Sequence, residues 1–290
     1  MTDEAPQPAW RWDRGENDVW TLWFDQPGRR HNILDRQALD ELDERLEEVE
    51  RDGSVSGLLI RSAKGGGFCA GADLKLFRQA ETAAEIESYA RRGIEVLDRL
   101  TRLKPPTTAV LHGVCLGGGF DLALACKHRA AVASDIPLQL GSPEIHFGII
   151  PIWGALQLLP RILAPKDALD LLLLGNPIGF LQAKSQGAVD RLISHDESER
   201  LLETLRFEPI TERPFTKEIW EDEIEFARVK LKQHSLDFPH APLAILDILR
   251  TDLNEGPKEA REAAVAKLVE LALDEESHAA IADFFDRPRG

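Results

Sequence analysis

Cysteine is scarce in this 290-residue chain, which has only Cys69, Cys115 and Cys126. The odd number and the lack of a Cys-x-x-Cys pair argue against a disulfide framework and against a structural zinc site. We therefore expect no bound metal and interpret the three thiols as small apolar packing residues.

Long apolar runs are also missing. The longest, near Leu169–Leu174, is far too short to cross a bilayer. The first six residues are acidic and lack an apolar core, which is not the pattern of a signal peptide. The sequence thus predicts a cytoplasmic protein without a membrane partner.

Positive charge is in deficit, with 35 Lys and Arg against 50 Asp and Glu and a net charge of −15. Such a surface repels nucleic acids and anionic membranes, so neither is an expected partner. A small anionic ligand would need a local group of cations. The candidates are Arg29, Arg30, Lys64, Lys75, Lys230 and Lys232.

Strand and helix patterns alternate over the first 200 residues, which predicts an α/β core with parallel strands. Expected strands cover 10–13, 19–24, 57–61, 107–112, 130–133, 138–140 and 189–193, and expected helices cover 36–52, 82–103, 118–126, 154–174 and 180–187. The first two strands form a hairpin. Later helices are expected at 216–233, 242–254, 257–273 and 275–285. We predict an α/β domain over 1–200 and a helical region over 201–290.

Two glycine loops share one design, because each follows a buried strand and leads toward a helix. The first is Phe68-Cys69-Ala70-Gly71-Ala72-Asp73-Leu74-Lys75, and the second contains Gly117-Gly118-Gly119-Phe120-Asp121. Such turns aim free N–H groups outward, and two donors aimed at one point form an oxyanion hole. Neither loop carries a phosphate-binding motif or the Gly-x-Ser-x-Gly pattern of a serine nucleophile.

Together with Gly141-Ser142-Pro143-Glu144 and Gly148-Ile149-Ile150-Pro151, these loops resemble the crotonase (enoyl-CoA hydratase/isomerase) superfamily. The resemblance implies a spiral of ββα units with a helical C-terminal region. It also implies an acyl-CoA thioester as substrate, no cofactor apart from the CoA carried by that substrate, and a homotrimer or hexamer. The later helices resemble those of the hydratase/isomerase part of multifunctional fatty-acid oxidation proteins.

The same resemblance implies a role for each matching residue. The N–H groups of Ala72 and Gly118 would bind the thioester oxygen, and Glu144 and Asp121 would transfer protons as catalytic acid and base. The remaining residues implied to line the substrate site are Ala70, Asp73, Lys75, Gly117, Gly141, Ile152 and Trp153.

Two of these positions depart from the family's hydratases. Asp121 stands where they have glutamate, which withdraws the carboxylate by about 1–1.5 Å, a displacement that can cost ~100-fold in rate. Ile152 stands where they have glycine and where dienoyl-CoA isomerases have an acid, so a dienoyl isomerase is not supported. Either Ile152 fills the water site, or the start of the helix is repacked locally.

Three classes of function follow from these residues. The first is an enzyme for hydration of 2-enoyl-CoA or for Δ3,Δ2-enoyl-CoA isomerisation with Glu144 as the acid/base. The second is a non-catalytic acyl-CoA-binding or assembly subunit that lost its water site. The third, a peptidase of the related Clp fold, is disfavoured because neither glycine loop presents a serine nucleophile.

Overall fold

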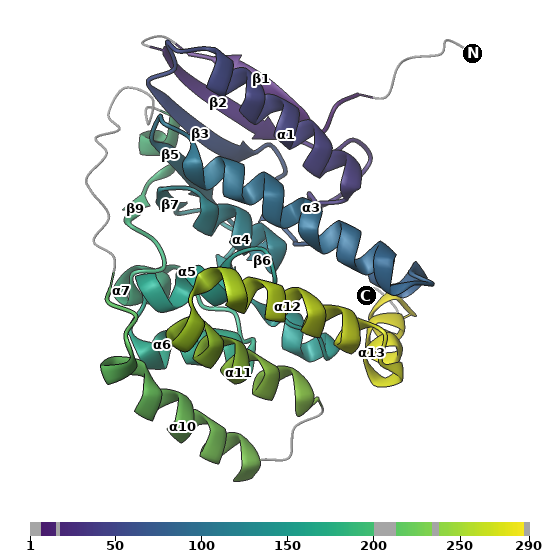
Figure 1. Ribbon diagram of the computed structural model, residues 1–290. Helices are drawn as coiled ribbons and strands as arrows, with labels where there is room; N and C mark the ends of the chain where they lie inside the picture. The colour runs from purple at the N-terminus through teal and green to yellow at the C-terminus, as the bar shows by residue number, and fades with distance from the viewer. Residues whose placement is uncertain (1–6, 16–17, 200–212, 234–237, 287–290) are drawn as a thin grey trace. The chain divides into compact units, whose positions relative to one another are not determined.

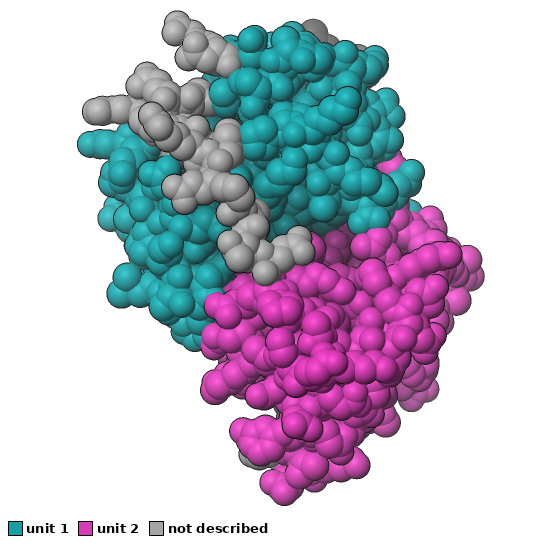
Figure 2. Space-filling model, turned by 60° about the vertical axis from the view of Figure 1, so that its left-hand side comes forward, with its two compact units in different colours: residues 1–72, 95–140, 178–210 teal, residues 73–94, 141–177, 211–290 magenta. Residues whose placement is uncertain are grey.

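The computed structural model describes residues 7–15, 18–199, 213–233 and 238–286. The chain forms two compact units, each assembled from three segments (Figure 2). The first unit comprises 1–72, 95–140 and 178–210, and the second comprises 73–94, 141–177 and 211–290. The predicted domain boundary at residue 200 lies outside the described residues and stays a prediction.

Six strands form the main sheet of the first unit, in the order β1-β2-β3-β5-β7-β9 (Figure 1). They are Trp10–Arg14, Val19–Phe24, Gly57–Ser62, Thr107–Leu111, His128–Val132 and Arg191–Ile193. The predicted hairpin of β1 and β2 is antiparallel, and every later pair of neighbours is parallel. Every residue of β5 is buried, as expected of a strand covered on both faces. The predicted α/β class is confirmed.

A second sheet has the order β4-β6-β8, with bounds Gly67–Cys69, Val114–Leu116 and Gln139–Gly141. β4 and β6 run parallel, and Cys69 lies opposite Cys115. β4 forms the start of the first glycine loop and β6 directly precedes Gly117 of the second, so the small sheet sets the loops side by side.

Among the described residues, the helices that lie wholly in the first unit are α1, α4, α7 and α8, over Arg36–Arg51, Gly118–Ala125, Phe180–Gln186 and His195–Glu199. α1 begins where the Asp35 carboxylate accepts a hydrogen bond from the Ala38 N–H at 2.9 Å. The indole N–H of Trp10 donates to the Ala38 carbonyl at 2.8 Å, which fixes α1 against β1. Each leucine that this face buries contributes about 1.5–3 kcal/mol.

The second unit is largely helical. It contains α2, the 3₁₀ helix η2, α5, α6, α10, α11, α12 and α13, over Leu74–Gln79, Pro143–Phe147, Ala155–Ile162, Pro165–Leu174, Lys217–Gln233, His240–Glu255, Pro257–Ala272 and Glu275–Asp286. α3, Ala83–Arg102, has its residues up to 94 in the second unit and the rest in the first.

The helical region expected over 154–174 is present and contains two helices, α5 and α6. Pro165 disfavours helical geometry at the residue before it, and Ala164 accordingly has a ψ of 151°. The predicted helices beyond residue 212 are present with bounds shifted by no more than two residues.

Helix α13 packs against η2, the segment that carries Glu144. The rings of Phe147 and Phe284 meet edge to face with centroids 5.3 Å apart. Ser277 lies so close to Gly148 that a side chain at that glycine would collide with it. Within the described part of the chain, no helix combines the length and the apolar character needed to cross a membrane.

Candidate active site

The first glycine loop is held by the buried side chain of Asn32. Its amide nitrogen donates to the carbonyl oxygens of Phe24 and Phe68 at 2.9 and 3.2 Å and to the Ser62 hydroxyl at 3.0 Å. Its amide oxygen accepts from the Gln26 N–H at 3.0 Å. These contacts make Asn32 the anchor of this loop.

The two loops touch backbone to backbone at Gly71. This residue has a φ of +115°, and a Cβ atom there would stand 2.9 Å from the Leu116 carbonyl oxygen and 3.5 Å from the Gly118 nitrogen. The Gly71 carbonyl accepts from the Leu34 N–H at 2.9 Å. Glycine adopts this positive φ readily and has no Cβ to collide with the second loop. Gly71 therefore lets the first glycine loop approach the second this closely.

The second loop opens α4 through Gly117, whose φ is +53°. Both the Phe120 and the Asp121 N–H groups donate to the Gly117 carbonyl, at 2.7 and 2.9 Å. The N–H of Gly118 lies at the first helical position, where the helix has no acceptor for it. Neither this N–H nor that of Ala72 donates to another described residue.

Asp121 lies in the first turn of α4, a helix whose residues are all buried, and is only 2% exposed. The helix dipole favours a carboxylate at this place. Close packing fixes the helix, since a Cβ at Gly119 would stand 2.5 Å from the Cys69 carbonyl oxygen. At its other end, buried Arg129 donates to the carbonyls of Cys126 and Ala188 at 3.1 and 3.0 Å.

All three cysteines are free thiols and are buried. Burial raises the pKa of Cys69 and of Cys126 to about 12. Burial also raises the pKa of Cys115, with the nearby Cys69, Asp121 and Cys126 adding to the effect. These thiols are protonated at neutral pH, which suits packing and not nucleophilic chemistry.

Glu144 lies in η2 of the second unit and is half-buried, with its Oε2 atom buried. Its carbonyl accepts from the Ile149 N–H at 3.3 Å, which closes the turn before the apolar segment. The turn is further held by Gly141, where a Cβ would stand 3.2 Å from the Cα of Pro177.

Ile152 and Trp153 follow in the same unit and are buried. The Trp153 indole N–H donates to the Ala90 carbonyl at 3.1 Å, and its ring packs on Tyr89 edge to face at 5.2 Å. The side chain of Trp153 is thus engaged with α3. No motif in the sequence points to Tyr89, although it is the only tyrosine of the chain.

The remaining predicted residues divide between the units. Ala70 is exposed in the first, while Asp73 caps α2 in the second by accepting from the Lys75 N–H at 3.1 Å. Lys64 and Arg29, two of the candidate cations, pair with Asp25 and Asp35 at 2.7 and 3.2 Å. Lys230 lies over the Phe226 ring. Arg30, Lys75 and Lys232 form no ion pair with another described residue.

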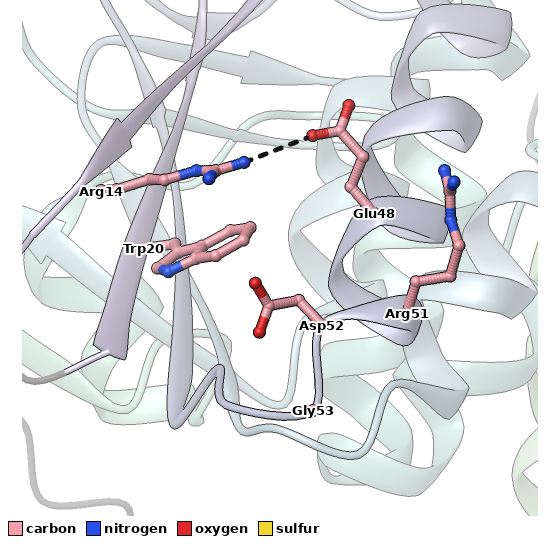
Figure 3. A pocket seen from close by; sticks show the side chains of 6 residues that line it. All are labelled: Arg14, Trp20, Glu48, Arg51, Asp52 and Gly53. Carbon is pink, nitrogen blue, oxygen red and sulfur yellow. Dashed lines mark ion pairs between the residues drawn. The ribbon is translucent and has the colours of Figure 1, made fainter.

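A surface pocket of about 460 Å³ lies elsewhere in the first unit (Figure 3). Its lining residues are Arg14, Trp20, Glu48, Arg51, Asp52 and Gly53. The Arg14 guanidinium lies over the Trp20 ring at 4.3 Å and 3.8 Å from a Glu48 oxygen. None of the predicted site residues lines it. The described residues also contain no group of three or more side chains suited to hold a metal ion.

The chain is similar to known proteins in sequence and in fold. The family model for enoyl-CoA hydratase/isomerase matches residues 14–212. The alpha subunit of the fatty acid oxidation complex from Shewanella sp. (strain ANA-3) is 31% identical over 285 residues, covering 94% of this chain and 40% of that protein. The corresponding subunit from Vibrio campbellii is 30% identical, with 97% and 41% covered. The chain thus spans about two fifths of the length of these relatives.

Solved structures share the fold. An enoyl-CoA hydratase from Rhodobacter sphaeroides 2.4.1 matches with a TM-score of 0.75 at 20% identity, covering 97% of this chain and 91% of that one. An enoyl-CoA hydratase/isomerase from Xanthobacter autotrophicus Py2 matches with a TM-score of 0.62 at 26% identity, covering 97% and 99%. The predicted crotonase-like fold is confirmed, and the chain belongs to the enoyl-CoA hydratase/isomerase family of enzymes.

Proposed function

We propose that this chain acts on enoyl-CoA thioesters by stabilising a thioester enolate and moving a proton at the carbon next to the carbonyl. The observation that carries the proposal is the pair of N–H groups of Ala72 and Gly118, on two loops in backbone contact at Gly71. Each such donor contributes about 3–4 kcal/mol to stabilisation of a developing oxyanion.

Two reactions share this enolate. In hydration of a 2-enoyl-CoA, water adds its oxygen to C3 while a proton is delivered to C2. In Δ3,Δ2 isomerisation, a base removes a proton from C2 of a 3-enoyl-CoA, and the same group returns it to C4. Both need a carboxylate that accepts and donates protons, and we assign this role to Glu144.

Asp121 is assigned the second carboxylate role, in which it assists the water of the hydration reaction. Its burial at the N-terminus of α4 supports a fixed orientation. We assign the CoA phosphates to exposed cations, of which Arg30 and Lys75 flank the motif loops. The proposed chemistry uses only groups of the chain and the substrate, so we propose that no additional cofactor or metal takes part.

The test compares the wild type with Glu144→Gln on crotonyl-CoA and on a 3-enoyl-CoA, with absorbance of the conjugated thioester as the readout. Crotonyl-CoA loses this absorbance on hydration, and the 3-enoyl substrate gains it on isomerisation. We expect turnover of at least one substrate, and a fall of about 100-fold or more in Glu144→Gln. Glu255→Gln, at an exposed position on α11, is the matched control. Full activity of Glu144→Gln would refute the assigned acid/base role.

A non-catalytic acyl-CoA-binding subunit is the second candidate, favoured by the buried, branched Ile152 where the family's hydratases have glycine. It predicts that calorimetry detects binding of butyryl-CoA while neither assay detects turnover. The double variant Asp121→Glu with Ile152→Gly should then gain hydratase activity. A double variant that binds butyryl-CoA but stays inert would contradict a blocked water site.

For the assembly, we propose a homotrimer or a hexamer on the basis of the family resemblance. Light scattering of the purified protein tests this directly. A particle of three or six times the mass of the chain agrees with the proposal, and a monomer contradicts it.

A further inference from the structure

The hydroxyl of Tyr89 holds the backbone next to one proposed oxyanion donor. The Asp73 N–H donates to the phenol oxygen of Tyr89 at 2.9 Å. This N–H belongs to the peptide group that joins Ala72 to Asp73. Asp73 is held on its other side as well, because its carboxylate accepts from the Lys75 N–H at the start of α2.

Tyr89 itself is fixed by aromatic neighbours. It is 0% exposed, and the rings of Phe77 and Trp153 pack on it edge to face at 5.9 and 5.2 Å. The Trp153 indole N–H donates to the Ala90 carbonyl, one residue along α3. The Trp153 ring also lies directly against Gly93, where any side chain would collide with it. A phenol enclosed in this way has little freedom to move its oxygen.

We propose that Tyr89 is a positioning residue for the oxyanion hole, with Trp153 as the side chain that holds its ring. This inference rests on the proposed function. The phenol oxygen fixes the Ala72–Asp73 peptide, and this restrains rotation about the Ala72 backbone. The N–H of Ala72 then keeps the direction that a thioester oxygen requires. Donors held in place before the reaction stabilise the transition state without a cost of reorganisation.

The variant Tyr89→Phe distinguishes a positioning role of Tyr89 from a role in packing alone. The ring and its edge-to-face contacts with Phe77 and Trp153 persist in this variant, and the phenol oxygen that accepts from the Asp73 N–H is lost. A purely structural tyrosine would change the thermal midpoint alone. A positioning tyrosine changes kcat, because the affected donor acts mainly on the transition state, and it leaves KM nearly unchanged.

Besides kcat, two measurements test the proposal. The first is hydrogen exchange, followed by mass spectrometry on peptides that contain Asp73. The second is the infrared carbonyl stretch of ¹³C-labelled butyryl-CoA bound to the protein, whose frequency falls as the oxyanion-hole hydrogen bonds strengthen. Thr101→Val is the matched control. It removes another hydroxyl from α3, one that donates to the Leu97 carbonyl at 3.0 Å.

In Tyr89→Phe we expect exchange at Asp73 to accelerate and kcat to fall, each by about five- to tenfold, the effect of one hydrogen bond. The carbonyl stretch should move toward its value in free butyryl-CoA. Thr101→Val should change none of these quantities. Unchanged exchange at Asp73, or faster exchange with an unchanged carbonyl stretch and kcat, would overturn the proposal.

The outcomes separate this inference from the proposed function. If the wild type neither binds nor turns over a thioester, the proposed function fails. The role of Tyr89 as an oxyanion-hole positioning residue fails with it, although the exchange data would still report its hold on Asp73. If the wild type is active and Tyr89→Phe matches it in all three readouts, only the inference about Tyr89 fails.

Discussion

Replacement of Asn32 by alanine should destabilise the first unit by about 2–4 kcal/mol, the sum over the hydrogen-bonding groups left unpaired. The Gln26 N–H loses the Asn32 oxygen, its partner at 3.0 Å, and the Phe68 carbonyl loses its bond at 3.2 Å. Two other partners are less affected. Phe24 still accepts from the Ala63 N–H, and the Ser62 hydroxyl still donates to the Gly67 carbonyl.

Tryptophan fluorescence during urea unfolding is the appropriate assay, because four of the six tryptophans lie in β1 and β2 of the same unit. With a urea m value of about 3 kcal/mol/M, the midpoint should fall by roughly 1 M. Asn254→Ala, at an exposed position on α11, should change stability by less than about 0.5 kcal/mol. A loss below about 1 kcal/mol in Asn32→Ala would refute the role of this side chain as the anchor of the first glycine loop.

Three further predictions concern other parts of the molecule. Gly71→Ala should reduce kcat by about 100-fold, because the backbone has a positive φ there and the added Cβ would crowd the Leu116 carbonyl oxygen, which displaces the Ala72 donor. Gly53→Ala is the control and should leave kcat unchanged, since a Cβ at Gly53 meets no atom within 4 Å. Equal kcat values for the two variants would contradict this prediction. Asp252→Ala should cost about 1.5–3 kcal/mol in a denaturation assay, because it removes the buried carboxylate that accepts from two Arg161 nitrogens at 2.9 Å each, while Arg161 keeps its bond to the Gln157 carbonyl. Stability should also fall above pH 9, since unfolded thiols ionise near 9.0 while Cys126 resists ionisation up to about 12. The difference between these two pKa values lowers the free energy of unfolding by about 1.4 kcal/mol per thiol at pH 10. In Cys126→Ala, the midpoint of urea unfolding should therefore decline less between pH 8 and pH 10 than it does in the wild type.

Local signals in the sequence were sufficient for much of the fold. Asp35 followed by leucines at helical spacing predicts α1, and the structure has the helix with that cap. The three-residue strands β4 and β6 and the six-residue helix α2 escaped prediction because they are too short to show a periodic pattern. Pro165 marks the break between α5 and α6 within the helical region expected over 154–174.

The candidate site was predictable only where backbone chemistry imposes a residue type. Gly71 and Gly117 need conformations that glycine adopts readily, and so they stand out in the sequence. The bond between Asp73 and Tyr89 leaves no such trace, because a buried tyrosine on a helix has the pattern of any core residue. The partner of Trp153 on α3 is 63 residues away in the chain, a separation that no local pattern encodes.

The packing of α13 on η2 has a consequence for synthesis on the ribosome. Glu144 leaves the ribosome long before residues 275–286, which supply Ser277 and Phe284 to its segment. The edge strand β9 of the main sheet likewise appears only at residues 191–193. Because each unit interleaves early and late segments, neither can complete its core during early translation. The nascent chain should therefore expose apolar surface for most of its elongation and depend on chaperones more than a chain of successive domains.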